Sequence, residues 1–189
     1  STLLASSAAS DVYKRQCYSS GNDGVDSNGT LTITGGTIVS IGTTSPEEGF
    51  DCDQNTFKIT GGTILGIGGG TSTPTSSVCT QRTVIYGGSG SKGTLLSIQG
   101  SDQVMSYTIP RAYSQMTLLF SSSKLASGTT YTIYTGGSVT GGTEFYGLTV
   151  GGTYTTGSQV ATFTPSSMVT SVGNVSSGGP GGGGGGWHW

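Results

Sequence analysis

The sequence has few charged residues, few cysteines and no long apolar run. Of its 189 residues, 7 are Lys or Arg and 9 are Asp or Glu, which gives a formal net charge of −2. This slightly acidic balance, without a basic patch, argues against nucleic-acid binding. No apolar stretch reaches the roughly 18 residues that a membrane-spanning helix needs. Cys17, Cys52 and Cys79 show no CxxC spacing, so a thiolate metal site is not expected, whereas a Cys52–Cys79 disulfide stays open.

The motifs of common catalytic machinery are also missing. The sequence contains no GxSxG, HExxH or P-loop pattern, and its only histidine, His188, lies in a Gly-rich C-terminal tail beside two Trp residues. Asp26 and Asp51 could in principle form a carboxylate pair for glycoside hydrolysis, but stacked structural acids are the simpler interpretation. We therefore expect a protein that is not an enzyme.

Glycine and alternating polar and apolar residues are abundant instead. The chain has 36 glycines and runs such as TLTITGG, TYTIYTGG and QVATFTP, in which apolar and polar residues alternate. A period of two with many Thr, Val, Ile and Tyr residues is typical of β-strands. Helical spacing is not sustained anywhere over ten residues, so the pattern predicts an all-β fold.

Residues 1–16 are set aside from the fold. The segment SSAASDVYKRQ back-translates, in frame, to a common transposase-based sequencing adapter, so we interpret residues 1–16 as adapter translation rather than native sequence. On this interpretation the native domain is truncated at its N-terminus and its export signal is missing. The remaining chain has five basic and eight acidic residues.

A repeat of 26 residues follows. LTITGGTI at 31–38 returns as FKITGGTI at 57–64, and GVDSN at 24–28 returns as GFDCD at 49–53 with one residue inserted after it. Repeats of this length are typical of stacked arrays. Each Gly-Gly pair could instead turn a β-hairpin. A hairpin does not need to match its neighbour, so the near-identity of the two copies favours coils that stack like residues on like, with Leu31 on Phe57 and Val39 on Leu65.

The sequence thus predicts three regions after the adapter. Residues 17–78 form coils of a parallel β-helix, and residues 79–173 form paired β-strands that cap or flank the coils. Residues 174–189, rich in glycine, form a flexible tail that cannot bury a core.

Acidic residues concentrate in the coils. Six of the eight remaining acids lie between residues 23 and 53, and no Lys or Arg occurs from 16 to 57. Stacking Asp26 over Asp51 and Asn28 over Asp53 would place acidic and amide side chains about 5 Å apart, the spacing between strands. A bound cation would remove the repulsion, and calcium (Ca²⁺) prefers such oxygen ligands. The candidate metal ligands are Asp23, Asp26, Asn28, Asp51 and Asp53.

Turn chemistry is the alternative explanation for the same residues. Asp and Asn favour turns because their side chains bind nearby main-chain groups and tolerate left-handed conformations. The stretch also lacks the third early ligand and the twelfth-position Glu of an EF-hand. The two explanations stay open at this point.

The coils and the C-terminal runs together resemble a known family. GVDSNGTLTITGGTI, GFDCDQNTFKITGGTI, SGTTYTIYTGG and GLTVGGTYTTGSQVATFTP are similar to the bacterial carbohydrate-binding domain-containing proteins that bind polygalacturonate, over residues 17–173. The resemblance implies a right-handed parallel β-helix, at the bacterial surface or secreted, that binds Ca²⁺ and acidic plant polysaccharide. It places Asp26, Asn28, Asp51 and Asp53 at the acidic coil positions of the family, and Cys52 departs from the small or polar residue expected there.

The expected function is therefore Ca²⁺-assisted binding of an acidic polysaccharide such as pectin by a monomer without catalytic activity. Two alternatives stay open. The first is a Ca²⁺-dependent polysaccharide lyase, for which Lys58, Arg82 and Arg111 are available as isolated bases. The second is a structural cell-surface protein or adhesin in which the coils serve as a rigid spacer.

Overall fold

The protein is all-β, as predicted. The computed structural model describes residues 13–176, and these form strands and turns without a helix. Accordingly, the described residues offer no helix long and apolar enough to cross a membrane. Two six-stranded sheets contain most of the strands, and three two-stranded sheets contain the rest.

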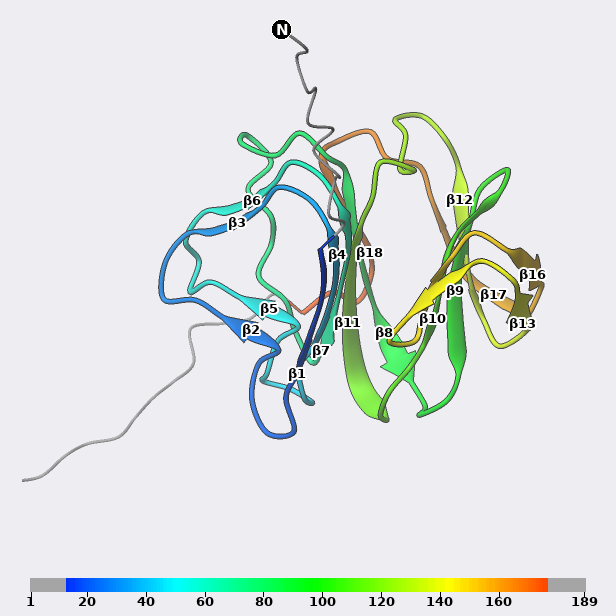
Figure 1. The fold of residues 1–189 in the computed structure, drawn as a ribbon, viewed down its shortest axis with the longest axis horizontal. Coiled ribbons are helices and arrows are strands. Elements are labelled where there is room, and N and C mark those ends of the chain that lie inside the picture. Colours follow the sequence, from blue (N-terminus) through cyan, green and yellow to red (C-terminus); the bar gives the residue numbers. More distant parts are fainter. Residues whose placement is uncertain (1–12, 177–189) are drawn as a thin grey trace, which may run out of the picture.

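The two large sheets face each other, with a hydrophobic core between them (Figure 1). The first sheet has, in order, β1 (Lys14–Tyr18), β4 (Thr37–Ile41), β7 (Thr63–Gly68), β11 (Tyr113–Ser121), β8 (Thr83–Gly90) and β18 (Val169–Gly173). The second sheet has, in order, β14 (Thr143–Phe145), β15 (Leu148–Val150), β10 (Gln103–Thr108), β9 (Leu95–Gln99), β12 (Tyr131–Thr135) and β17 (Ser158–Phe163). The two-stranded sheets pair β2 (Val25–Asp26) with β5 (Phe50–Asp51), β3 (Leu31–Ile33) with β6 (Phe57–Ile59), and β13 (Ser138–Thr140) with β16 (Thr153–Thr155).

The two repeat copies stack in parallel. Leu31 pairs with Phe57 in β3 and β6, and Val39 pairs with Leu65 in β4 and β7, as the repeat predicts. The hairpin alternative is wrong, because β3 and β4 pair with the next copy and not with each other. The inserted residue shifts the register, since Asp26 pairs with Asp51, at an offset of 25, before the offset of 26 is reached.

Parallel pairing extends to residues that the sequence analysis set aside. Residues 14–16 form the first half of β1 and pair with residues 37–39 of β4. Strand pairing uses main-chain groups, which every residue other than proline supplies, so the edge of β4 accepts a strand whatever its side chains.

After β7 the chain continues to stack on the second repeat copy, but it forms no named strand there. Ser72 N–H donates to the Phe50 carbonyl at 2.7 Å, and Thr80 N–H donates to the Ile59 carbonyl at 3.0 Å. Residues 71–81 therefore lie on β5 and β6 although their sequence no longer matches the repeat. The chain then enters β8, which pairs with β11 and not with β7.

The region after residue 81 flanks the coils with mainly antiparallel strands. β11 adds to β7 in antiparallel fashion, with Leu119 opposite Gly66, and thereby extends the first sheet. The whole molecule is thus a mixed β structure in which parallel coils are one part. The predicted parallel β-helix is not established as the architecture of the chain.

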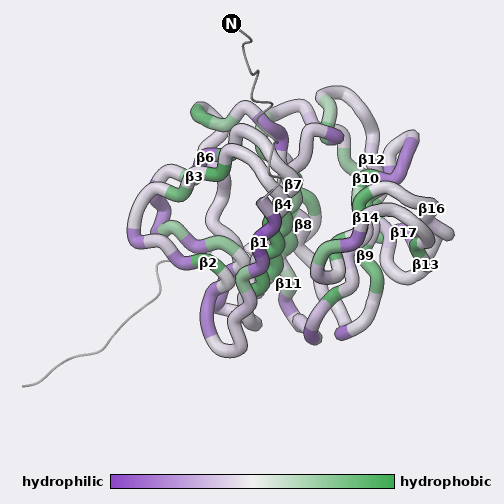
Figure 2. The backbone as a smooth tube through the Cα atoms, in the orientation of Figure 1, coloured by the Kyte–Doolittle hydropathy of each residue, from purple (hydrophilic) through white to green (hydrophobic). Residues whose placement is uncertain are grey.

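Two hydrophobic cores lie on opposite faces of the first sheet. Val39, Leu65 and Leu118 belong to the core between the two large sheets, which we call the inter-sheet core. Ile64 and Leu119 belong to the other core, inside the curve of the coils, which we call the coil core. Neighbouring residues alternate between the cores because side chains alternate across a strand. Figure 2 accordingly shows hydrophobic colouring along the central strands and hydrophilic colouring on the outer loops.

The cysteines and the C-terminus also have defined positions. Among the described residues all three cysteines are free, and both Cys52 and Cys79 are buried in the coil core. The start of the predicted tail is ordered against the sheet, where Asn174 N–H donates to the Gly87 carbonyl at 3.2 Å. Residues 177–189, including His188, lie outside the described residues.

Candidate acidic site

Three acidic residues lie together where the coils leave the first sheet. Asp23 follows β1, Glu48 follows β4, and Asp51 belongs to β5. We call these three residues the acidic cluster. Glu48 N–H donates to Asp23 Oδ1, and the charges of Asp51 and Asp23 each raise the pKa of Glu48. The loops involved lie at the lower end of β1 and β4 in Figure 1.

The main chain holds Glu48 on both sides. Glu48 N–H donates to Asp23 Oδ1, and Gly24 N–H donates to the Glu48 carbonyl at 3.0 Å. On the other side Glu48 forms a parallel bridge with Gly70, and Gly49 N–H donates to the Gly70 carbonyl at 3.2 Å. The loop around Glu48 is therefore fixed between the preceding and following segments of the stack.

This close stacking needs a glycine at the corner. A Cβ atom on Gly42 would lie 1.9 Å from the Glu48 carbonyl oxygen, which is closer than any non-bonded contact allows. Only glycine lets the chain after β4 return along Glu48 so tightly.

The Glu48 side chain is buried without full hydrogen bonding. The residue is 4% exposed, and within the described part of the chain its Oε2 atom is buried with no hydrogen-bond partner. Burial raises the pKa of Glu48 to about 7, with further increases from the charges of Asp51 and Asp23, while hydrogen bonding to Ser72 opposes the shift. Such a carboxylate carries either a proton or an uncompensated charge near neutral pH.

The pKa values of the neighbouring acids Asp23 and Glu47 are raised as well. Burial raises the pKa of Asp23 despite the hydrogen bond from Glu48 N–H, and the charges of Asp51 and Asp26 raise it further. Burial, followed by the charges of Asp23 and Asp51, also raises the pKa of Glu47. The site therefore favours any species that brings positive charge, whether a proton or a cation.

Of the five predicted ligands, three lie at or next to the acidic cluster and two lie outside it. Asp23 and Asp51 join Glu48, and Asp26 pairs with Asp51 in the predicted register. Asn28 and Asp53 are exposed and lie in the irregular stretch between the paired strands, so their predicted stacking is absent from the strand pairs of the described residues.

Turn chemistry accounts for part of the predicted set. Asp51 Oδ1 accepts a hydrogen bond from Asp53 N–H at 2.9 Å and another from the Ser72 hydroxyl at 3.3 Å. Asp53 and Gln54 adopt left-handed conformations, with φ of 48° and 61°. An Asp that bonds the main chain two residues on is a common turn element. Asp53 therefore belongs to a turn that absorbs the inserted residue.

Sequence reasoning missed Glu48 as a site residue. A signal was present, because the alignment of GVDSN with GFDCD, extended back by one residue, places Asp23 opposite Glu48. What the sequence did not reveal was the burial of Glu48, which depends on Gly70 and Ser72 from the following segment.

The ligand types at this site suit Ca²⁺, but the side chains alone do not form a complete coordination shell. Carboxylate and hydroxyl oxygens are suitable ligands. Within residues 13–176, however, no three Asp, Glu, His or Cys side chains are grouped so that they could hold a metal ion. Main-chain carbonyls, the Ser72 hydroxyl and water would have to complete the coordination shell.

Comparisons with protein-family models, with curated proteins and with solved structures gave no match in any of the three.

Proposed function

We propose that the protein is an extracellular carbohydrate-binding protein that binds acidic polysaccharide with the assistance of Ca²⁺ at the acidic cluster. The observation that carries the proposal is the buried Glu48 carboxylate, whose Oε2 atom lacks a partner within the described residues and which lies beside Asp23 and Asp51. A cation would bond this oxygen and offset the repulsion between the three carboxylates.

The number of available ligands supports a role in bridging. Ca²⁺ takes 6–8 oxygen ligands, more than Asp23, Glu48 and Asp51 supply as single carboxylates. The remaining positions suit uronate carboxylates of the polysaccharide. The protein would then attract a polyanion through the cation, although its own net charge is negative.

We further propose that residues 17–81 are coils of a right-handed parallel β-helix. The parallel pairs of β3 with β6 and of β4 with β7, together with the hydrogen bonds from residues 72–80 onto β5 and β6, support this architecture. In such a stack Asp23 and Glu48 occupy equivalent positions of successive coils, which places the acidic cluster along one edge.

Replacing Glu48 by Gln tests the proposed role of Ca²⁺. We expect Glu48→Gln to weaken Ca²⁺ binding about tenfold or more, because affinity depends on the number of charged ligands. Retention of polygalacturonate in affinity electrophoresis should fall in parallel. Asp102→Asn makes the same change of charge at the turn between β9 and β10, outside the cluster, and should behave like the unmodified protein.

Other outcomes would contradict the proposal. If polygalacturonate binding is the same with Ca²⁺ and with chelator, the cation has no role in it. Release of unsaturated products, followed by ultraviolet absorbance, would instead identify a lyase. A glycan array that retains no polysaccharide would favour the structural or adhesin function.

A further inference from the structure

Polar depressions lie over β8 and β11 of the first sheet and do not include the residues of the acidic cluster in their lining. Gly88, Gln115 and Asn174 line a cavity of about 700 Å³, and Ser91, Thr94 and Thr135 line one of about 460 Å³. Ser89 and Ser114 belong to both linings, so the two cavities adjoin at these residues. We call these two adjoining cavities the groove, and their volumes are of a size that suits sugar units.

A β-bulge places the side chains at the centre of the groove. In the pairing of β8 with β11, Tyr113 lies opposite Gly90 and Met116 lies opposite Gly88, so the register shifts between them. Two residues, Ser114 and Gln115, thus face the single residue Ser89, and all three are exposed. Bulges re-aim side chains and occur often beside binding sites.

The residues that line the groove include no Asp or Glu. Their side chains are mainly hydroxyls and amides, which both donate and accept hydrogen bonds. The sequence has no Asp or Glu from residue 54 to 101 or from 103 to 143. Asp102 lies at the other end of β9 from the loop that lines the groove.

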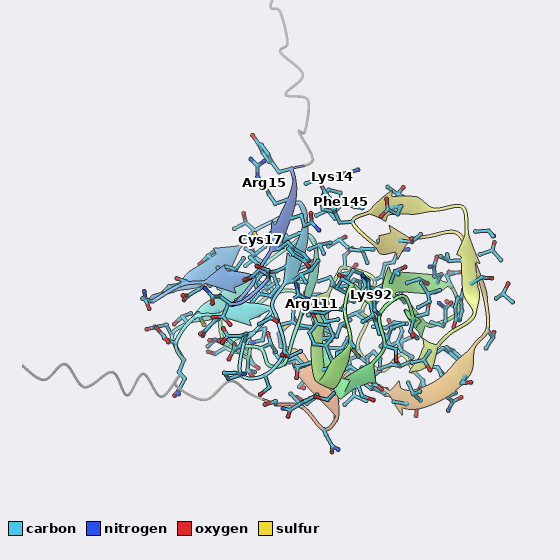
Figure 3. The ribbon with its side chains drawn as sticks, turned by 90° about the horizontal axis from the view of Figure 1, so that it is seen from below. Lys14, Arg15, Cys17, Lys92, Arg111 and Phe145 are labelled. Atoms are coloured by element: carbon cyan, nitrogen blue, oxygen red, sulfur yellow. The ribbon has the colours of Figure 1, made fainter. Side chains whose placement is uncertain are left out.

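Two basic residues, Lys92 and Arg111, lie next to residues that line the second cavity. Lys92 follows the lining residue Ser91, and Arg111 precedes the lining residue Ala112. Their loops are joined by hydrogen bonds from Gly93 N–H to the Ile109 carbonyl at 2.8 Å and from Ile109 N–H to the Thr94 carbonyl at 3.0 Å. Figure 3 shows Lys92 and Arg111 on neighbouring segments.

Arg111 is held in place by the end of β1. Its guanidinium lies over the Tyr18 ring, 4.9 Å from the centroid, and its Nη2 donates to the Ser19 carbonyl. Its Nε atom is buried with no partner within the described residues. Tyr18 as a residue is 60% exposed, which leaves an aromatic surface beside the charge. A held guanidinium is well suited to binding a carboxylate.

We infer that this groove binds an extended acidic oligosaccharide directly, without a metal ion. The hydroxyl and amide side chains bind sugar hydroxyls, and Lys92 and Arg111 bind the carboxylates. This inference rests on the proposed function and gives the acidic glycan a second contact surface. A neutral glycan would not use the two cations, and a nucleic acid would call for a larger basic surface.

The test uses the full chain, oligogalacturonate and a Ca²⁺ chelator, so that the acidic cluster does not contribute. We expect Lys92→Glu to lower the affinity about tenfold and the weakened binding to lose much of its salt dependence, because an attraction is replaced by a repulsion. Lys58→Glu makes the same change on β6, remote from the groove lining, and should leave the affinity unchanged. Ser114→Phe, at an exposed position, should obstruct the groove and also weaken binding.

Each outcome separates the two proposals. Equal affinities of Lys92→Glu, Ser114→Phe and Lys58→Glu for oligogalacturonate would overturn the groove, even if Ca²⁺-dependent binding persists. Absence of binding with and without Ca²⁺ would overturn the proposed function as well. Equal binding of fully methyl-esterified oligogalacturonate, or equal competition by a short single-stranded DNA, would show that the groove does not select acidic sugars.

Discussion

At the scale of single residues, burial and neighbouring charges disfavour the ionised form of Glu48. Its carboxyl group is buried beside Asp51 and Asp23, and the pKa of Glu48 rises to about 7 as a result. The charged form of such a group is disfavoured in the folded protein and not in the unfolded chain. The residue therefore couples the stability of the fold to pH and to any cation that reaches the site.

The pH dependence of stability follows from this shift. Between the ordinary value of 4.5 and about 7, the folded protein keeps a proton on Glu48 that the unfolded chain has released. Stability should therefore fall as pH rises through this window, by up to about 3 kcal/mol. Glu48→Gln should remove most of the fall, as measured by urea denaturation at pH 5 and pH 8. A stability that is constant or increases over this range in the unmodified protein, with no effect of the substitution, would contradict the burial of Glu48.

The turn between β5 and β6 shows how an element accommodates an inserted residue. The offset of 25 between β2 and β5 becomes 26 between β3 and β6, and Asp53 and Gln54 absorb the difference in left-handed conformations. Asp tolerates this region comparatively well, whereas the longer Gln side chain does so at a cost of about 1 kcal/mol or more. The insertion thus stores local strain in an exposed turn.

Glycine at position 54 should relieve this strain. We expect Gln54→Gly to stabilise the protein by about 1 kcal/mol, because glycine adopts positive φ without steric conflict. The exposed Thr56 lies two residues further on and does not have a positive φ, so Thr56→Gly should destabilise by roughly 0.5–1 kcal/mol. Thermal denaturation of both variants measures the difference, and a destabilising Gln54→Gly would refute the strained turn.

The whole molecule is organised around a sheet that is buried on both faces. On β11, Leu118 packs in the inter-sheet core and Leu119 packs in the coil core, and both are fully buried. Removing either side chain leaves a cavity against the same sheet. Because the two cores share this sheet, the coils and the second sheet should unfold together.

Alanine at the two positions tests this cooperativity. We expect Leu118→Ala and Leu119→Ala each to lower the free energy of unfolding by about 2–5 kcal/mol. Both variants should keep one transition, with coincident curves from tyrosine fluorescence and far-ultraviolet circular dichroism. Two separate transitions in Leu119→Ala would show that the coils fold independently of the second sheet.

The candidate site was predictable only in part. The repeat located the acids and the pairing of Asp26 with Asp51, because both follow from residues at fixed spacing. It did not single out Glu48, whose burial depends on the following, irregular segment. Asn28 and Asp53 lie outside the paired strands of the described residues, so their stacking stays a prediction.

The sequence alone determined the strands and the stacking of the two copies, because alternation and a matched repeat are local patterns that act through neighbouring main chains. Only the tertiary structure decided that β11 adds to β7, that Glu48 is buried between two segments, and that Lys92 and Arg111 flank one groove. These arrangements join residues far apart in the chain. They depend on which surfaces bury each other, and that selection is made by the packing of the two cores.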